Sequence, residues 1–210
     1  MPPTTTPLHP FAGSPVILAG SPLSTHQVEA VAEELVRVEL DPDSRTRVAA
    51  CRQQLETAAA RGATHYGINT GFGKFSRQRV EASELRELQA NLIRSHAAGV
   101  GDPLPTPIVR GMIVILAASL SRARSGVRPE LIESLLALLN AGITPVVPES
   151  GSVGASGDLA PLAHVALALI GEGEVFDASG NRNSSADAFK ASGLAPEPLE
   201  AKEGLALSTG

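Results

Sequence analysis

The most distinctive stretch of this sequence reads Gly151-Ser152-Val153-Gly154-Ala155-Ser156-Gly157-Asp158. It follows an extended segment at 145–148 and leads into an apolar run at 159–170, which predicts a buried helix. A glycine-rich loop before a helix offers free backbone N–H groups, so phosphate binding is one interpretation. A tight turn that caps the helix is a second interpretation, and unusual backbone chemistry is a third.

The common loop motifs do not fit this stretch. No lysine follows it, so the nucleotide-binding pattern G-x-x-x-x-G-K-[ST] is not matched. No preceding strand supports the glycine fingerprint of dinucleotide-binding folds. The four residues Gly-Ala-Ser-Gly at 154–157 also differ from the G-x-S-x-G turn that presents a nucleophilic serine.

The tripeptide Ala155-Ser156-Gly157 has the atoms for a ring closure of the backbone. Attack of the Gly157 nitrogen on the carbonyl carbon of Ala155 closes a five-membered ring and releases water. Small residues permit the compressed backbone that this attack needs. Loss of the Ser156 hydroxyl then gives an exocyclic methylene conjugated to the ring. The product is an electrophile, which ordinary side chains do not provide.

The rest of the chain predicts a mainly helical domain with a small β component. Two short strands are expected at 15–20 and 36–40, paired in one sheet, and Ser24 with Gln27 forms a capping box between them. Further helices are expected at 44–61, from Ser83 to His96, from Thr106-Pro107 onward, at 131–139 and at 186–191, and a hairpin at 175–176. The first of these helices has Val48, Cys51, Leu55 and Ala58 on one stripe, and the next points Leu85, Leu88 and Leu92 inward. The third carries Ile108, Met112, Ile115 and Leu116.

Composition narrows the class of protein. The 210 residues are 43% hydrophobic and carry a net charge of −5, so no basic face is offered to nucleic acid. The single cysteine, Cys51, excludes an internal disulfide and predicts a cytoplasmic location. No apolar run reaches membrane-span length, and the N-terminus lacks signal-peptide features. No spacing suggests a metal site, and His9, His26 and His65 have no predicted role.

Four stretches together identify a family. Residues 151–164 strongly resemble the signature of the aromatic amino acid ammonia-lyases, in which Ala-Ser-Gly cyclises to 4-methylidene-imidazol-5-one (MIO). Residues 66–73, 91–99 and 202–207 resemble three further active-site stretches of that family, in the same order. The resemblance implies a helical N-terminal domain of the ammonia-lyase (fumarase/aspartase-like) fold at 15–210. It also implies that the central helix bundle is missing. Residues 1–14 are rich in Pro and Thr, which predicts a flexible arm.

The resemblance assigns roles to individual residues. It implies that Ala155, Ser156 and Gly157 form MIO, that Tyr66 is the catalytic base, and that His96 contacts the substrate. Supporting roles fall to Asn69, Gly73 and Asp158; the last either polarises the cyclising backbone or caps the next helix. From the residues alone, Tyr66 also fits a buried tyrosine with a bonded hydroxyl, and His96 a surface or capping histidine. His164 lies within a helix and is predicted to be structural.

The Ser-His-Ala-Ala-Gly sequence at 95–99 resembles the members that act on histidine. This resemblance implies conversion of L-histidine to trans-urocanate and ammonia, with no metal or diffusible cofactor. A tyrosine or phenylalanine lyase, or an aminomutase, is the alternative, and an inactive fragment that associates with an intact partner is another.

The C-terminal residues depart from the family pattern. The family continues after Leu207 with an apolar residue and an asparagine that helps to hold the ring. In the simplest alignment this sequence has Thr209 in place of that asparagine; the alternative is that the asparagine lies beyond a frame disruption. The sequence stops as an apolar segment begins, so an interrupted chain is expected. Family members are homotetramers whose sites combine several subunits. We therefore expect the isolated chain to be inactive or unstable without a companion chain.

Overall fold

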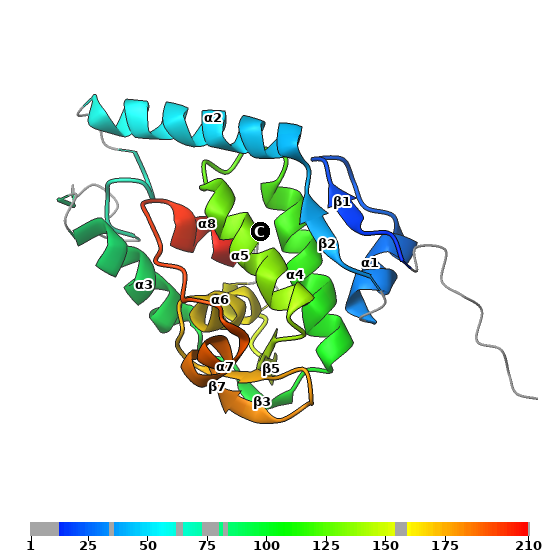
Figure 1. Cartoon of the computed structure of the whole chain (residues 1–210). Coiled ribbons are helices and arrows are strands. Elements are labelled where there is room, and N and C mark those ends of the chain that lie inside the picture. Colours follow the sequence, from blue (N-terminus) through cyan, green and yellow to red (C-terminus); the bar gives the residue numbers. More distant parts are fainter. Residues whose placement is uncertain are drawn as a thin grey trace, which may run out of the picture.

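The computed structural model describes residues 13–33, 36–61, 65–72, 80–81, 84–153 and 159–209. It is mainly helical, with 52% helix and 12% strand, as the sequence predicts. The predicted arm lies outside the described residues up to position 12. In chain order the elements are β1 (Val16–Leu18), α1 (Thr25–Ala32), β2 (Val38–Leu40), α2 (Pro42–Ala60), α3 (Leu85–His96), β3 (Val100–Pro103), α4 (Thr106–Leu120), α5 (Pro129–Asn140), β4 (Thr144–Pro145), β5 (Pro148–Ser150), α6 (Leu159–Leu169), β6 (Glu174–Phe176), β7 (Arg182–Ser184), α7 (Ser185–Ser192) and α8 (Glu203–Thr209) (Figure 1).

The N-terminal unit is a parallel pair of strands connected by a helix. Strands β1 and β2 pair in parallel, and α1 makes the crossover between them. The predicted capping box is present, because the Ser24 hydroxyl accepts from the Gln27 amide and the Gln27 side chain accepts from the Ser24 amide. The side chain of Asn140 bonds both the N–H and the C=O of Val38, so α5 fixes the edge of this sheet.

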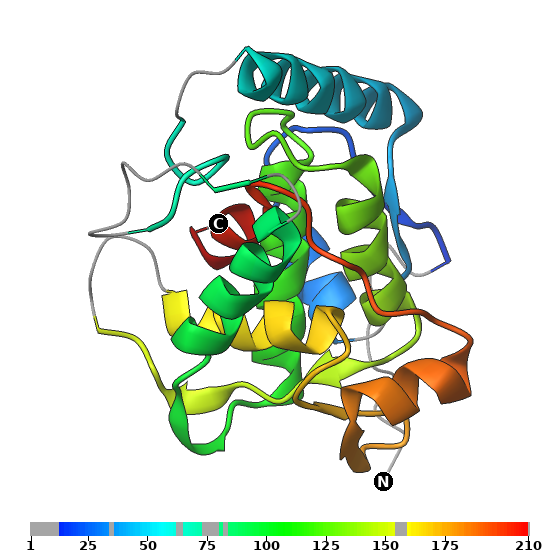
Figure 2. The same ribbon diagram turned by 90° about the vertical axis from the view of Figure 1, so that its left-hand side faces the viewer.

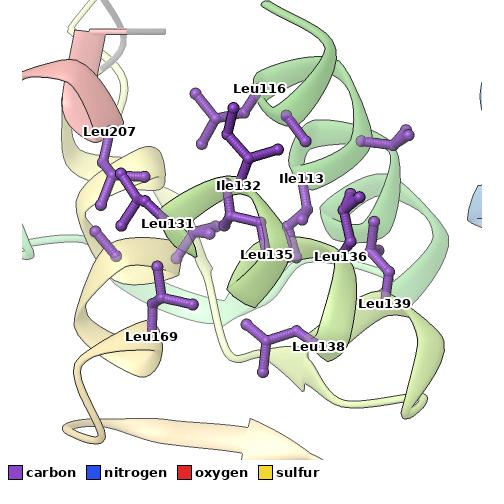
Figure 3. Packing of buried hydrophobic residues seen from close by; sticks show 14 of the residues in the cluster. Ile113, Leu116, Leu131, Ile132, Leu135, Leu136, Leu138, Leu139, Leu169 and Leu207 are labelled. Carbon is purple, nitrogen blue, oxygen red and sulfur yellow. The ribbon is translucent and has the colours of Figure 1, made fainter. Parts of the chain in front are cut away.

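Helices α4 and α5 form the centre of the hydrophobic core (Figure 3). Ile113 and Leu116 of α4 pack with Leu131 and Leu135 of α5, and Leu207 of α8 reaches the same cluster. Of the four apolar residues that the sequence analysis names in α4, Leu116 is buried and Met112 is half-buried, whereas Ile108 is 52% exposed and Ile115 is 56% exposed. Helix α4 is apolar on all sides, so its 3.6-residue period does not select a face, and packing against α1 and α5 selects it instead.

Helix α2 lies across one end of the molecule, at the top of Figure 1. It begins at Pro42 after an Asp41 cap, two residues before the predicted start. Ser44, the predicted first residue, lies within the helix and is buried, and its hydroxyl donates to the carbonyl oxygen of Ser121 at 2.6 Å. Within the predicted stripe Val48 is buried, whereas the other three residues are half-buried. This helix therefore covers the core with one narrow edge.

The remaining helices follow the predicted order with small shifts of their ends. Helix α3 has Glu84 at its N-cap rather than Ser83, which lies outside the described residues. Helix α4 has Pro105 at its N-cap, one residue before the predicted Thr106. Strands β6 and β7 form the predicted hairpin, and β4 extends it to three strands. Helix α7 ends at Gly193, whose left-handed φ of 68° closes the helix.

Candidate active site

Three helices bring together three of the stretches that the sequence singles out. Helices α3, α6 and α8 pack pairwise against one another, as green, yellow and red ribbons in Figure 2. They carry His96 at the end of α3, the residues after the Ala155-Ser156-Gly157 triplet in α6, and the 202–207 stretch in α8. The predicted site residues Gly73, Ala155, Ser156, Gly157 and Asp158 lie outside the described residues.

The tyrosine loop is held in shape by Asn69. The Asn69 side-chain oxygen accepts from the His65 amide at 2.7 Å, and the Asn69 amide donates to the His65 carbonyl at 3.2 Å. The Asn69 carbonyl accepts from the Val80 amide at 3.0 Å. With 5% of its surface exposed, Asn69 joins the two ends of its own turn to the returning chain. The structure thus places this predicted supporting residue within the loop.

Tyr66 projects from this loop and is 57% exposed. Its ring meets that of Phe72 edge-to-face, with centroids 6.0 Å apart and an angle of 84°. Gly67, the next residue, has φ +73°, and a Cβ there would overlap Leu205 of α8. The loop therefore rests on α8 through a glycine. The exposure of the Tyr66 ring differs from that expected of a buried tyrosine with a structural hydroxyl.

His96 uses one ring nitrogen to bind its own helix. Nδ1 lies 2.8 Å from the Leu92 carbonyl oxygen and 3.0 Å from Ser95 Oγ, which itself donates to that carbonyl. A carbonyl oxygen only accepts, so Nδ1 carries the hydrogen. In the neutral imidazole, Nε2 is then the acceptor. His96 thus ends α3 with a ring orientation fixed by its helix and an acceptor nitrogen at the other side of the ring.

Two glycines let the backbone after His96 contact the backbone before the triplet. A Cβ on Gly151 would lie 3.4 Å from Gly99 Cα and 3.2 Å from Ala160 Cβ. A Cβ on Gly99 would lie 3.1 Å from His164 Nε2 and 3.2 Å from Pro148 Cβ. The Gly99 amide donates to His164 Nε2 at 3.1 Å. The two glycine-bearing segments therefore meet on α6 at separations that leave little room for larger residues.

Gln89 is a supporting residue of the candidate site that the sequence does not single out. It is fully buried in α3, and its Oε1 accepts from the Gly204 amide at 2.9 Å and from the Leu205 amide at 3.3 Å. A Cβ on Gly204 would lie 2.8 Å from the Gln89 carbonyl oxygen, so α3 and α8 are in backbone contact. The available signal is a polar residue on the stripe of Leu85, Leu92 and Ile93.

A buried ion pair fixes the start of α8. Glu203, with no exposed surface, accepts from the Arg128 guanidinium and from the backbone amides of Arg128 and Glu200. Burial by itself lowers the pKa of Arg128, but the hydrogen bond and charge of Glu203 outweigh it and raise the pKa above its ordinary value. Next to it, burial lowers the pKa of the Lys202 ammonium, whose backbone has φ 78°.

Thr209, which the simplest alignment sets against the family's asparagine, is bonded within its own helix. It is exposed, and its hydroxyl donates to the Leu205 carbonyl at 2.8 Å. Within the described part of the chain, no group of three or more His, Cys, Asp or Glu side chains is placed to hold a metal ion. Of the helices in the same part, none is long and apolar enough to cross a membrane.

Comparisons with known proteins agree with this geometry. The family model "Aromatic amino acid lyase" matches residues 23–210. A histidine ammonia-lyase of Stigmatella aurantiaca is 51% identical over 191 residues, which are 91% of this chain and 37% of that protein. The histidine ammonia-lyase structure from Trypanosoma cruzi has 36% identity and a TM-score of 0.85, over 93% of this chain and 37% of that one. The tyrosine aminomutase structure from Streptomyces globisporus has 39% identity and a TM-score of 0.85, over 93% and 36%.

Proposed function

Because this chain belongs to the aromatic amino acid lyase family, we propose that it is the electrophile-bearing part of an enzyme that converts L-histidine to trans-urocanate and ammonia. The chain spans about 37% of the curated relatives that it matches, so the activity is proposed for the whole protein. For that protein we further propose a homotetramer in the cytoplasm, for which the lone Cys51 supports a reducing location.

The orientation of His96 is the observation that carries the choice of substrate. Because Nδ1 donates to the Leu92 carbonyl, the neutral ring offers Nε2 as an acceptor. A substrate imidazole has an N–H that donates to such a nitrogen. The phenyl ring of phenylalanine has no donor, so binding it would leave the His96 nitrogen without a partner in a closed site.

The proposed electrophile is MIO, formed from Ala155-Ser156-Gly157. The backbone at the start of the triplet loop supports the fit, because Gly151 is packed where a Cβ would crowd Ala160 and Gly99. The loop leaves β5 at Ser150 and enters α6 at Leu159, so both ends are anchored in regular structure. When formed, this group supplies an electron-poor methylene that draws electron density from the substrate and eases departure of the amine.

Tyr66 is the proposed base for the β-proton of the substrate. Its loop is held by the hydrogen bond between Asn69 and His65, and it contacts α8 at Gly67. Helix α8 is hydrogen-bonded through Gln89 to α3, the helix that ends at His96. The base and the substrate-side histidine are thereby connected through two packed helices. A well-placed base of this kind contributes roughly 10²–10⁴-fold to a proton transfer.

Tyrosine is the second candidate substrate, for a lyase or an aminomutase. The phenol O–H also donates to an acceptor nitrogen, so the His96 geometry accommodates it. The similarity to a tyrosine aminomutase structure favours the same alternative. A piece that only associates with an intact partner is the non-catalytic alternative, which the exposed Thr209 supports.

A chimera tests the proposal. The matched region of the Stigmatella aurantiaca relative is replaced by this chain, and purified protein is assayed with L-histidine, L-tyrosine and L-phenylalanine by chromatography of the products. We expect urocanate as the main product, and its loss in the Ser156→Ala and Tyr66→Phe variants. In His96→Leu we expect KM for histidine to rise about tenfold, because one hydrogen bond to the ring is lost. Preferential formation of coumarate or a β-amino acid would establish the tyrosine alternative, and a folded, inactive chimera the non-catalytic one.

A further inference from the structure

Helix α6 carries one polar side chain in an otherwise apolar sequence. The helix reads Leu-Ala-Pro-Leu-Ala-His-Val-Ala-Leu-Ala-Leu, and His164 is the sixth residue. The side chain is half-buried, and its Nε2 accepts the Gly99 amide at 3.1 Å across 65 residues of sequence. A histidine within an apolar helix needs such a partner, because an unbonded polar group loses its hydration on burial.

The bond lies where three segments meet. Gly99 is three residues after His96, and it contacts Pro148 at the start of β5 as well as Gly151, which precedes the triplet. Ala160 and His164 are one turn apart on α6, so the same face of the helix contacts Gly151 and Gly99. His164 is therefore the side-chain acceptor at the junction of the substrate-side segment with the triplet loop.

Accepting the Gly99 amide requires a neutral His164 with its hydrogen on Nδ1. Protonation of Nε2 would place two N–H groups against each other and break the bond. Burial lowers the pKa of His164, so the surroundings favour the neutral form that the bond needs. Charged or titratable groups on the segments around it are Arg94 and His96 in the last turn of α3, Asp102 of β3, Glu149 of β5, Glu172 after α6 and Glu203 of α8. Burial is the cause of the lowered pKa.

We propose that His164 is a positioning residue, which holds the Gly99 backbone on α6 and so sets the place of His96 relative to Gly151 and the start of α6. Its role in catalysis rests on the proposed function, whereas the bond itself does not. Gly99 and Gly151 are part of the same arrangement, because glycines have no Cβ and so allow the two backbone segments to lie close to His164 and α6.

Amide hydrogen exchange of the intact chain tests the bond without any turnover. His164→Leu removes the acceptor and introduces an apolar side chain of similar size. His164→Gln is the matched control because the glutamine side-chain oxygen can accept from the Gly99 amide. By mass spectrometry of peptides over 97–101, we expect Gly99 to exchange about fivefold faster or more in the leucine variant. The glutamine variant should restore slow exchange, and amides of α4 and α5 should be unchanged in both. Unchanged exchange at Gly99, no rescue by glutamine, or loss of protection across α4 and α5 would overturn the proposal.

The pH dependence separates this role from simple packing. Between about pH 8 and about pH 5, after correction for the intrinsic exchange rate, protection of Gly99 should fall in the wild-type chain and persist in His164→Gln. Equal pH profiles for the two proteins would contradict the proposal.

In the chimera, His164→Leu should raise KM for histidine about fivefold with little change in kcat. An unchanged KM would show that the bond does not position the substrate side. An unmodified triplet in the wild-type chain would instead count against the proposed function alone.

Discussion

Gln89 and His164 are polar residues on apolar helix faces, and each accepts backbone amides from a different segment. Gln89 takes the amides of Gly204 and Leu205 at the start of α8, and His164 takes that of Gly99. These bonds connect the helices that carry the candidate site. Positions of this kind decide where the functional side chains lie, although neither residue is a candidate for the chemistry.

Replacing Gln89 by leucine should destabilise the chain. The change keeps the size of a fully buried side chain but leaves the Gly204 and Leu205 amides without their acceptor. Each buried amide without a partner costs about 1–3 kcal/mol, so we expect a loss of about 2 kcal/mol or more in the free energy of unfolding. Urea titration followed by circular dichroism measures it.

Gln53→Leu on the exposed face of α2 is the matched control, expected to change stability by about 0.5 kcal/mol or less. Equal stability of the Gln89 and Gln53 variants would show that the bonds to α8 do not contribute.

At the residue scale, the sequence predicts the candidate residues but not their supports. Tyr66 and His96 stand out through a recognisable local pattern, and the structure gives each an environment. The partners of Gln89 and His164 lie 115 and 65 residues away, which no local pattern contains. A polar residue on an apolar stripe shows that a partner is needed, but it does not show which one.

At the scale of elements, α4 shows where periodicity fails. The sequence predicts most of the helices in order from caps, prolines and glycines, and the Ser24 capping box is confirmed in detail, but the sequence does not predict α8 as a helix. In α4, apolar residues occur on every side: Leu116 is buried and Met112 is half-buried, whereas Ile108 and Ile115 are exposed. The buried face is set by α1 and α5, which a single helix does not specify.

A matched pair of substitutions in α4 tests which face is buried. Ile113 has no exposed surface, whereas Ile115 is 56% exposed, and the two differ in little else. We expect Ile113→Ala to cost about 2–5 kcal/mol because it leaves a cavity among well-packed side chains. Ile115→Ala should cost less than about 1 kcal/mol. Chemical denaturation of both variants measures the difference, and a larger loss for Ile115 than for Ile113 would contradict the packing of α4 described above.

At the scale of the whole molecule, stability should depend on the protonation of His164. Its pKa in the folded chain lies below the ordinary value of 6.5, so the unfolded chain binds more protons in that window. The contribution of neutral His164 to the free energy of unfolding is therefore fully present above about pH 6.5, and it is lost as the pH falls through the pKa of His164 in the folded chain. We expect the free energy of unfolding to fall over this range in the wild-type chain and to fall less in His164→Gln.

The carboxyl groups of Glu172, Glu174 and Asp177 have lowered pKa values because they accept hydrogen bonds. Their contributions are lost below about pH 4.5, whereas the contribution of His164 begins to fall near pH 6.5. A wild-type curve that is flat between about pH 7 and about pH 5 would contradict the assignment to His164.

Part of the candidate site depends on contacts between distant segments, which this sequence alone does not predict. The mainly helical fold is predicted correctly, but the meeting of α3, α6 and α8 comes from packing and from glycines that permit close approach. The chain spans about 37% of its curated relatives, so groups that other parts of those proteins supply lie outside it. We therefore expect histidine turnover in the chimera and not in the isolated chain.

Intact mass spectrometry with peptide mapping across Gly151 to Asp158 tests whether this chain forms MIO from its own backbone. It is made on purified chain that circular dichroism shows to be folded, with Ser156→Ala as the control. We predict that the wild-type chain is lighter than its sequence by two water molecules, that the deficit maps to Ala155-Ser156-Gly157, and that the variant does not form the methylidene group. An unmodified triplet in the folded wild-type chain would contradict the proposal that this chain bears the electrophile.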